Sequence, residues 1–363
     1  MQIDFHHGVT YIVARKAGFD HHDAQIVAHC AQYVDDATAS GTINFNNGAM
    51  YARISSAHKM LDYRNFEELS NHQVWIPFHF LPGNANKPAD QNVDGDFIEK
   101  IICCPNSHVA QDMVKACISA KSQHEKYALH RLGITMHVYA DTWAHQGFAG
   151  VNHDVNDVFD VTEENANEGQ NWASKVGSFF SNMWDSAAST FVSDALPLGH
   201  GAVLNYPDLP YLKWSYKNRY TNKLIKRDNP TDFVAAADHM CMAMKRYIDG
   251  NPNAVVSGLT SADKKTLKSY FEEITDESGE HRHRKWLSLI NDDMFGLGSQ
   301  RVTYLSKGPG SWKDKALGRK RGKVYVYSNE FLSSDWKCFH DALLAHRFDL
   351  VHHVLPEYKI CAA

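Results

Sequence analysis

The chain has 363 residues, of which 44% are hydrophobic and 22% charged, and its formal net charge is −5. These values are ordinary for a globular protein long enough to bury a large core, and the negative charge argues against bulk electrostatic binding to nucleic acid. Histidine is the unusual component, with 22 copies, and an excess of imidazole is typical of a protein with several metal ligands.

The first half of the chain is predicted to be helical. Apolar residues at three- and four-residue spacing predict helices over residues 5–19 and 21–38, with a break at residues 18–20. A third helix is predicted over residues 47–61, whereas the Pro-rich residues 74–88 are predicted to form a loop that carries His79. Further helices are predicted over residues 106–121, 123–146, 173–190, 230–250, 261–275, 284–294 and 334–354.

Two segments depart from this helical pattern. Residues 150–172 are acidic and rich in Asn and Asp, which predicts a surface excursion, and residues 323–328 alternate like a short strand. The sequence therefore predicts an all-α, multi-helix fold with long loops and only a minor sheet. We expect a metal-binding helical catalytic core over residues 1–215, with a small, mostly helical C-terminal extension over residues 216–363 packed on it.

Cysteine use and the N-terminal sequence bear on the compartment. The seven cysteines contain no C-x-x-C pattern, and Cys30 and Cys117 lie in apolar, helix-like contexts, which indicates buried free thiols rather than a disulfide framework. The first residues show no basic region followed by an apolar run, so no secretory signal is visible. No stretch approaches the roughly 18 apolar residues of a membrane span. We expect a protein made in the cytoplasm, with any export through a specialised secretion system.

The most informative segment contains His137, Asp141 and His145. Each helical residue advances about 100°, so positions i, i+4 and i+8 lie in one stripe along a helix. Two imidazoles and a carboxylate in one stripe suit a divalent transition metal, with zinc as the first choice. A single His/Asp pair is often only a hydrogen bond, but a buried triple favours a metal. Because one helix supplies at most three ligands, the others must come from elsewhere.

Further candidate ligands lie in stiff or helical segments of the first 210 residues. They are Asp4, His6, His7, Asp35, Asp36, His79 and His200. Each has an ordinary structural interpretation when taken alone: Asp4 can cap a helix, the acidic pair can end one, and His79 can pack among aromatic rings. Together with the helical triple they provide enough nitrogen and oxygen ligands for two or three ions.

On these residues the sequence resembles the superfamily of zinc-dependent phospholipases C and P1-type nucleases, and within it a divergent bacterial branch of zinc metallophospholipases C. The resemblance covers roughly residues 1–215 and is carried by residues 139–148 (YADTWAHQGF), 32–36 (QYVDD), 75–82 (WIPFHFLP), 199–201 (GHG) and 207–208 (PD). The first of these strings is specific, and the others are individually weak. The resemblance implies an all-helical enzyme with a trinuclear zinc cluster.

Carried over residue by residue, the resemblance implies that His137 and Asp141 are ligands, with Asp141 bridging two ions, and that His145 is a third. The remaining implied ligands are His6 or its neighbour His7, Asp35, His79 and His200. His153 competes with His200, because His153 and Asp157 copy the H-x-x-x-D/E spacing of the family's last pair. Asp35 or Asp36 would orient or deprotonate the attacking water.

The sequence departs from the family pattern in two places. His145 follows Asp141 a couple of residues earlier than in the best-known members. Those members also bind zinc through the amine and carbonyl of an N-terminal Trp, whereas this chain has Met1 there. We expect Asp4 to substitute as an oxygen ligand.

These assignments predict a zinc metallohydrolase with two or three Zn²⁺ ions that cleaves phosphodiester bonds. The favoured activity is that of a phospholipase C acting on phosphatidylcholine-type phospholipids at a membrane surface. Two alternatives stay open: a P1-like zinc nuclease or phosphatase, and a non-catalytic metal-binding helical protein. Nucleic acid is the less favoured substrate because an acidic surface repels its phosphates.

Overall fold

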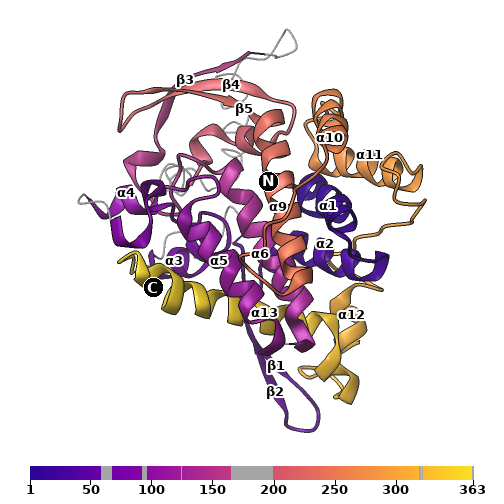
Figure 1. The fold of residues 1–363 in the computed structure, drawn as a ribbon. Coiled ribbons are helices and arrows are strands. Elements are labelled where there is room, and N and C mark those ends of the chain that lie inside the picture. Colours follow the sequence, from indigo (N-terminus) through magenta and orange to yellow (C-terminus); the bar gives the residue numbers. More distant parts are fainter. Residues whose placement is uncertain are drawn as a thin grey trace, which may run out of the picture.

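The computed structural model describes residues 1–58, 68–91, 96–123, 125–164, 199–318, 320 and 322–361. Within these residues the chain is mostly helical with two small antiparallel sheets (Figure 1), which confirms the prediction of a helix-dominated fold. The helices are α1 (Thr10–Ala17), α2 (His21–Asp36), α3 (Glu68–Phe78), α4 (Phe97–Ile101), α5 (His108–Ser119), α6 (Ala128–Ala144), α9 (Asn229–Asp249), α10 (Ser261–Glu273), α11 (Gly279–Asn291), α12 (Trp312–Leu317), α13 (Asp335–Asp349) and α14 (Leu355–Glu357). The strands are β1 (Gly41–Asn44), β2 (Met50–Arg53), β3 (Val158–Glu163), β4 (Lys213–Asn218) and β5 (Leu224–Asp228).

Helix α6 is the central element of the molecule. It packs against α2, α9 and α13, and nearly every residue along it is buried. A Cβ atom added at Gly133 would lie 2.5 Å from both the Cβ of Cys30 and the carbonyl oxygen of Val27. Glycine at this position therefore lets α2 approach α6 closely, which brings the end of α2 next to the predicted metal ligands of α6.

The chain begins with a π-helix, η1 (Asp4–Val9), that continues directly into α1. Helix α1 ends at Gly18, whose φ of 116° lies in the left-handed region that favours glycine. Asp20 then caps α2 by accepting a hydrogen bond from the Asp23 amide. The predicted break between the first two helices is confirmed.

Three predicted elements differ from the structure. The described part of residues 47–61 contains β2 rather than a helix, because residues 41–53 form a hairpin in which Gly48, with φ of 87°, helps to turn the chain. The predicted loop over residues 74–88 begins as the last turns of α3, which continues through Pro77. The short strand predicted over residues 323–328 is reduced to one bridge between Phe45 and Tyr325.

The second sheet has the order β3-β4-β5, with both pairs antiparallel. The described part of the acidic excursion, residues 150–164, contributes β3 to this sheet, while residues 165–172 and the helix predicted over 173–190 lie outside the described residues. The predicted boundary after residue 215 falls inside β4. The largest apolar core also draws on both sides of that boundary, since Phe5 of η1 packs against Phe233 and Phe271.

The cysteines found in the described residues are free thiols. Burial raises the pKa of Cys30 and of Cys117, which makes both thiols poor nucleophiles and poor metal ligands at neutral pH. Among the helices described, none combines the length and the apolar character needed to cross a bilayer.

Substituting alanine for Gly133 is expected to lower the free energy of unfolding by roughly 1–3 kcal/mol, because the added methyl group overpacks the contact with α2. In an open helical position the same change would stabilise the helix by about 1 kcal/mol. The sign of the change therefore tests the close contact. Urea unfolding measures it, with Lys115→Ala on the exposed side of α5 as the control. A stabilised Gly133→Ala variant would contradict the contact.

Candidate metal centre

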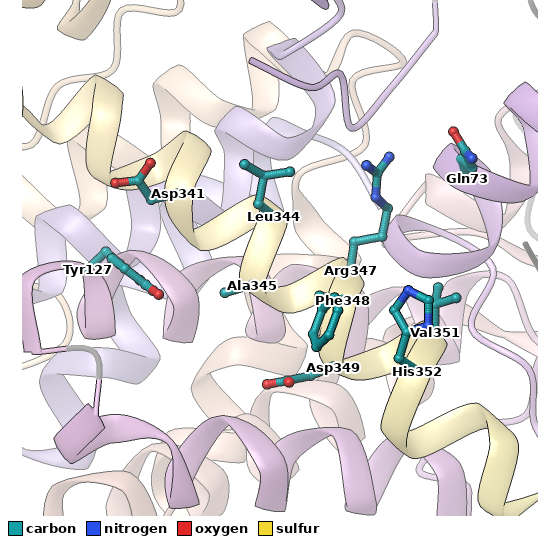
Figure 2. A pocket seen from close by; sticks show the side chains of 10 residues that line it. All are labelled: Gln73, Tyr127, Asp341, Leu344, Ala345, Arg347, Phe348, Asp349, Val351 and His352. Carbon is teal, nitrogen blue, oxygen red and sulfur yellow. The ribbon is translucent and has the colours of Figure 1, made fainter. Parts of the chain in front are cut away.

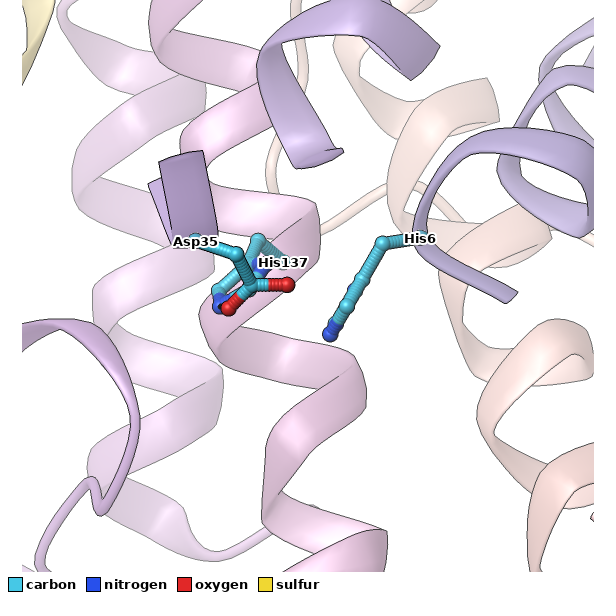
Figure 3. Close-up of side chains that lie close together, drawn as sticks. All are labelled: His6, Asp35 and His137. Atoms are coloured by element: carbon cyan, nitrogen blue, oxygen red, sulfur yellow. Dashed lines mark ion pairs between the residues drawn. The ribbon is translucent and has the colours of Figure 1, made fainter. Parts of the chain in front are cut away.

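Eight His and Asp side chains form three groups, two of which share His137, and within each group the potential ligand atoms lie within 4.8 Å of one another. The groups are His6, Asp35 and His137; His79, His137 and Asp141; and His145, His200 and Asp208. Figure 3 shows the first of these, in which His6 points toward His137 on α6 and Asp35 at the end of α2. Seven of the residues predicted as ligands are thus brought together from five parts of the chain.

Two neighbouring imidazoles of the centre are oriented by backbone carbonyls. The Nδ1 of His137 lies 2.6 Å from the Ala31 carbonyl oxygen, and the Nε2 of His79 lies 2.9 Å from that of Ser56. A carbonyl oxygen can only accept a hydrogen bond, so each of these nitrogens carries the proton. The other nitrogen of each ring therefore turns a lone pair toward the centre.

The same arrangement recurs on the other side of Asp141. The Nδ1 of His145 donates to the His79 carbonyl oxygen at 2.7 Å, and the Nδ1 of His200 donates to that of Leu204 at 2.7 Å. Their Nε2 atoms face the carboxylate of Asp208, each at 3.6 Å from one of its oxygens. Hydrogen bonds that fix the tautomer in this way are the usual support of metal-binding histidines.

The closest pair of free nitrogens is the Nε2 of His137 and the Nδ1 of His79, which lie 3.3 Å apart. Both nitrogens also lie within 3.5 Å of Asp141 Oδ2, at 3.3 and 3.5 Å respectively. Asp141 Oδ2 is buried and has no hydrogen-bond partner among the described residues. Two lone pairs and an unpartnered carboxylate oxygen at these distances repel one another unless a proton or a metal cation lies between them.

The α-amine of Met1 supplies one positive charge to the centre. The amine nitrogen lies 2.6 Å from Asp141 Oδ1 and 3.1 Å from Asp208 Oδ1. Burial lowers the pKa of this amine, but the two carboxylates outweigh burial and raise it to about 11. Burial would raise the pKa of Asp141, but His145, the amine and the other imidazoles hold it well below its usual range. The centre therefore favours positive charge.

The centre is closed on most sides and opens beside Asp35 and His200. His6, His137 and Asp141 are at most 1% exposed. The side chain of Asp35 is 31% exposed and that of His200 is 18% exposed. Burial raises the pKa of Asp35 although His137 and His79 oppose the shift. Asp35 is thus the carboxylate at the centre that water reaches most easily.

Three predicted site residues, Asp4, His7 and Asp36, lie outside the three groups of potential ligands. Asp4 is paired with Arg282, at 2.6 Å, so it is not available as an oxygen ligand. His7 turns away from His6 and bonds His283, with 2.9 Å between Nδ1 and Nε2. Asp36 accepts a hydrogen bond from the Tyr304 hydroxyl at 2.5 Å, since successive residues of α2 point in different directions. Asp36 therefore does not reach the centre.

The competing late histidine, His153, is also outside the centre. Its Nδ1 accepts a hydrogen bond from the Val155 amide and caps a short 3₁₀ helix (Asp154–Asn156). Asp208, which was not predicted as a ligand although it follows Pro207, faces His145 and His200 in the third group. Met1 was missed as well, because a backbone amine leaves no signal in a residue pattern.

The helix ending at Ala144 is held by another buried arginine. Arg227, on β5, donates to the carbonyl oxygens of Trp143 at 2.9 Å and Ala144 at 3.1 Å. These carbonyls are among those that a helix end leaves without a helical partner. Arg227 therefore fixes the end of α6 where His145 follows as the capping residue.

A separate cavity of about 710 Å³ lies along α13, as Figure 2 shows. Its walls include Tyr127, Leu344, Arg347 and Phe348. None of the residues of the three groups lines it. Size alone does not make this cavity the active site.

Comparison with known proteins gives a family without an assigned activity. Residues 1–354 match the model of a family of unknown function, DUF6765, and the chain belongs to that family. The chain matches no curated protein and no solved structure.

Replacing Asp208 by asparagine is expected to reduce zinc binding by about one ion per chain, because it removes the carboxylate that faces both His145 and His200. Metal analysis after dialysis against zinc measures the change. Asp157→Asn is the matched control, since the Asp157 side chain is only partly buried and lies 3.9 Å from Arg219, outside the three groups. Equal zinc contents in the two variants would contradict this assignment of the late ligands.

Proposed function

We propose that this protein is a zinc-dependent phosphodiester hydrolase, and that its activity is that of a phospholipase C on phosphatidylcholine-type lipids. The observation that carries the proposal is the pair of inward lone pairs on His79 and His137 facing the unpartnered oxygen of Asp141. The arrangement leaves no proton of the neutral rings between these three atoms, because each ring donates its N–H to a backbone carbonyl. It suits a divalent cation with nitrogen and oxygen ligands.

The residues present fit two or three ions. One would be held by Asp35, His79, His137 and Asp141, and another by His145, His200 and Asp208. His6 is the donor left for a third ion, with Asp141 shared. Bound zinc ions would neutralise the charge on a phosphodiester's oxygens and lower the pKa of a water molecule to about 7.

Asp35 is the residue best suited to orient or deprotonate the attacking water. Asp35 belongs to the centre, and its side chain is more exposed than those of Asp208 and Asp141. A carboxylate within hydrogen-bond reach of a water molecule can act as a general base. His137 Nε2 and His79 Nδ1 each lie 3.8 Å from its Oδ1, so this oxygen faces the centre. Asp36 points to Tyr304 and takes no part.

The substrate class rests on the resemblance in residues 139–148 and 75–82 and on one feature of the site. Trp75, one turn before His79, is partly exposed, and the two rings lie 5.1 Å apart. An indole beside the centre could receive a choline group by cation–π contact. The buried rings of Phe5, Phe78, Phe148 and Trp214 belong to the core instead.

The neighbouring pair Asp35 and Asp36 gives a direct test of the proposed chemistry. Asp35→Asn is expected to lower kcat on phosphatidylcholine in mixed micelles by about 10²–10⁴-fold, the usual contribution of a general base. Asp36→Asn should retain most of the activity, because its carboxylate lies outside the centre. Zinc content measured on both variants separates loss of a ligand from loss of a proton acceptor. Equal losses in the two variants would refute the assigned role.

Substrate choice is tested on the wild-type protein loaded with zinc. We expect release of phosphocholine from phosphatidylcholine and little cleavage of single-stranded DNA or of a phosphomonoester. Preferential cleavage of DNA would show that the protein is a zinc nuclease rather than a phospholipase C. Tight zinc binding without hydrolysis of any of the three substrates would identify a non-catalytic metal protein.

A further inference from the structure

Helix α11 lies more than 270 residues after His6 in sequence and packs against η1, the π-helix that carries this histidine. The six residues of η1 are buried, and α11 packs directly on them. A π-helix is rare in proteins and is frequently found at functional sites. The surroundings of η1 therefore decide where His6 and the Met1 amine lie.

Arg282 of α11 is the centre of this contact. It is fully buried, its Nε donates to Asp4 Oδ2 at 2.6 Å, and its Nη2 donates to Asp4 Oδ1 at 3.3 Å. Nη2 also donates to the Gln2 side chain at 2.9 Å. Nη1 donates to the carbonyl oxygens of Asp276 and Glu277 at 2.7 and 3.1 Å. All five N–H groups of the guanidinium are thereby used, two of them in a bidentate grip on one carboxylate.

The residues around Arg282 extend the contact along η1. His283 bonds His7, and a Cβ atom added at Gly8 would lie 3.1 Å from the Cβ of Trp286. Residues 2, 4, 7 and 8 are thus held from one side by α11. His6 points the other way, stacked on His137 with 3.8 Å between ring centroids and with its Nε2 3.1 Å from Asp141 Oδ1.

We propose that α11 positions the metal centre through Arg282, which fixes Asp4 and Gln2 and thereby sets the place of His6 and the Met1 amine. The proposal rests on the proposed function, because it assumes that His6 binds a metal ion. Arg282 belongs to none of the three ligand groups. It is a positioning residue, and through it the C-terminal extension (residues 216–363) holds the segment that carries His6.

The test is the affinity of the purified full-length protein for Zn²⁺, measured by competition with a chelating dye. Arg282→Lys keeps the charge but cannot form the bidentate grip. We expect it to weaken the binding of one zinc ion by about 10–100-fold, the usual effect of losing a support behind a ligand. Arg284→Lys, on the exposed side of the same helix, is the matched control and should bind zinc as the wild type does.

A double-mutant cycle separates positioning from a general loss of structure. In a His6→Ala background the weakened ion has lost its ligand, so Arg282→Lys should have little further effect on zinc affinity. Gln2→Ala removes one of the five hydrogen bonds and serves if Arg282→Lys fails to fold. It should lower affinity by a smaller factor that also disappears in the His6→Ala background.

Two negative results are distinguishable. Wild-type zinc affinity in folded Arg282→Lys, or in folded Gln2→Ala if the lysine variant does not fold, would overturn the positioning role and leave the proposed function intact. An effect of the same size with and without His6 would also overturn the role. Wild-type protein that binds no zinc would overturn the proposed function together with this inference.

Discussion

The structure depends on one electrostatic constraint, the burial of two carboxylates among imidazoles whose lone pairs turn inward. Asp141 is 1% exposed, and the protons of His79 and His137 are committed to backbone carbonyls. Anions and lone pairs buried in this way are costly without a compensating cation. The Met1 amine supplies one positive charge, 2.6 Å from Asp141 Oδ1. Among the described residues, it makes no contact with the inward nitrogens of His79 and His137.

The rest of the fold holds these groups against one another. Gly133 lets α2 approach α6 so that Asp35 arrives beside His137. Arg227 binds the end of α6 from β5, and Arg282 binds Asp4 of η1 from α11. Both arginines come from the part of the chain after residue 215. Residues 216–363, which the resemblance does not cover, therefore stabilise the positions of the candidate ligands in residues 1–215.

Sequence reasoning identified those ligands whose spacing is local. His137, Asp141 and His145 follow a helical period, and His79 lies in a recognisable string, so these residues could be named without coordinates. It failed where only tertiary contacts determine which of two adjacent residues of the same type faces the centre. His6 and His7, or Asp35 and Asp36, differ only in the direction that a helix gives them. Asp4 was assigned to a metal because its partner, Arg282, is 278 residues away. The hairpin over residues 41–53 was missed because its apolar residues also fit a helical spacing.

The most direct test of the account is a crystal structure of the zinc-loaded protein with anomalous scattering recorded on both sides of the zinc absorption edge. The account predicts anomalous peaks at roughly 2.0–2.1 Å from His79 Nδ1 and His137 Nε2 and from the Nε2 atoms of His145 and His200. Zinc-loaded crystals without such peaks, in which these imidazoles instead bond water or one another, would contradict it.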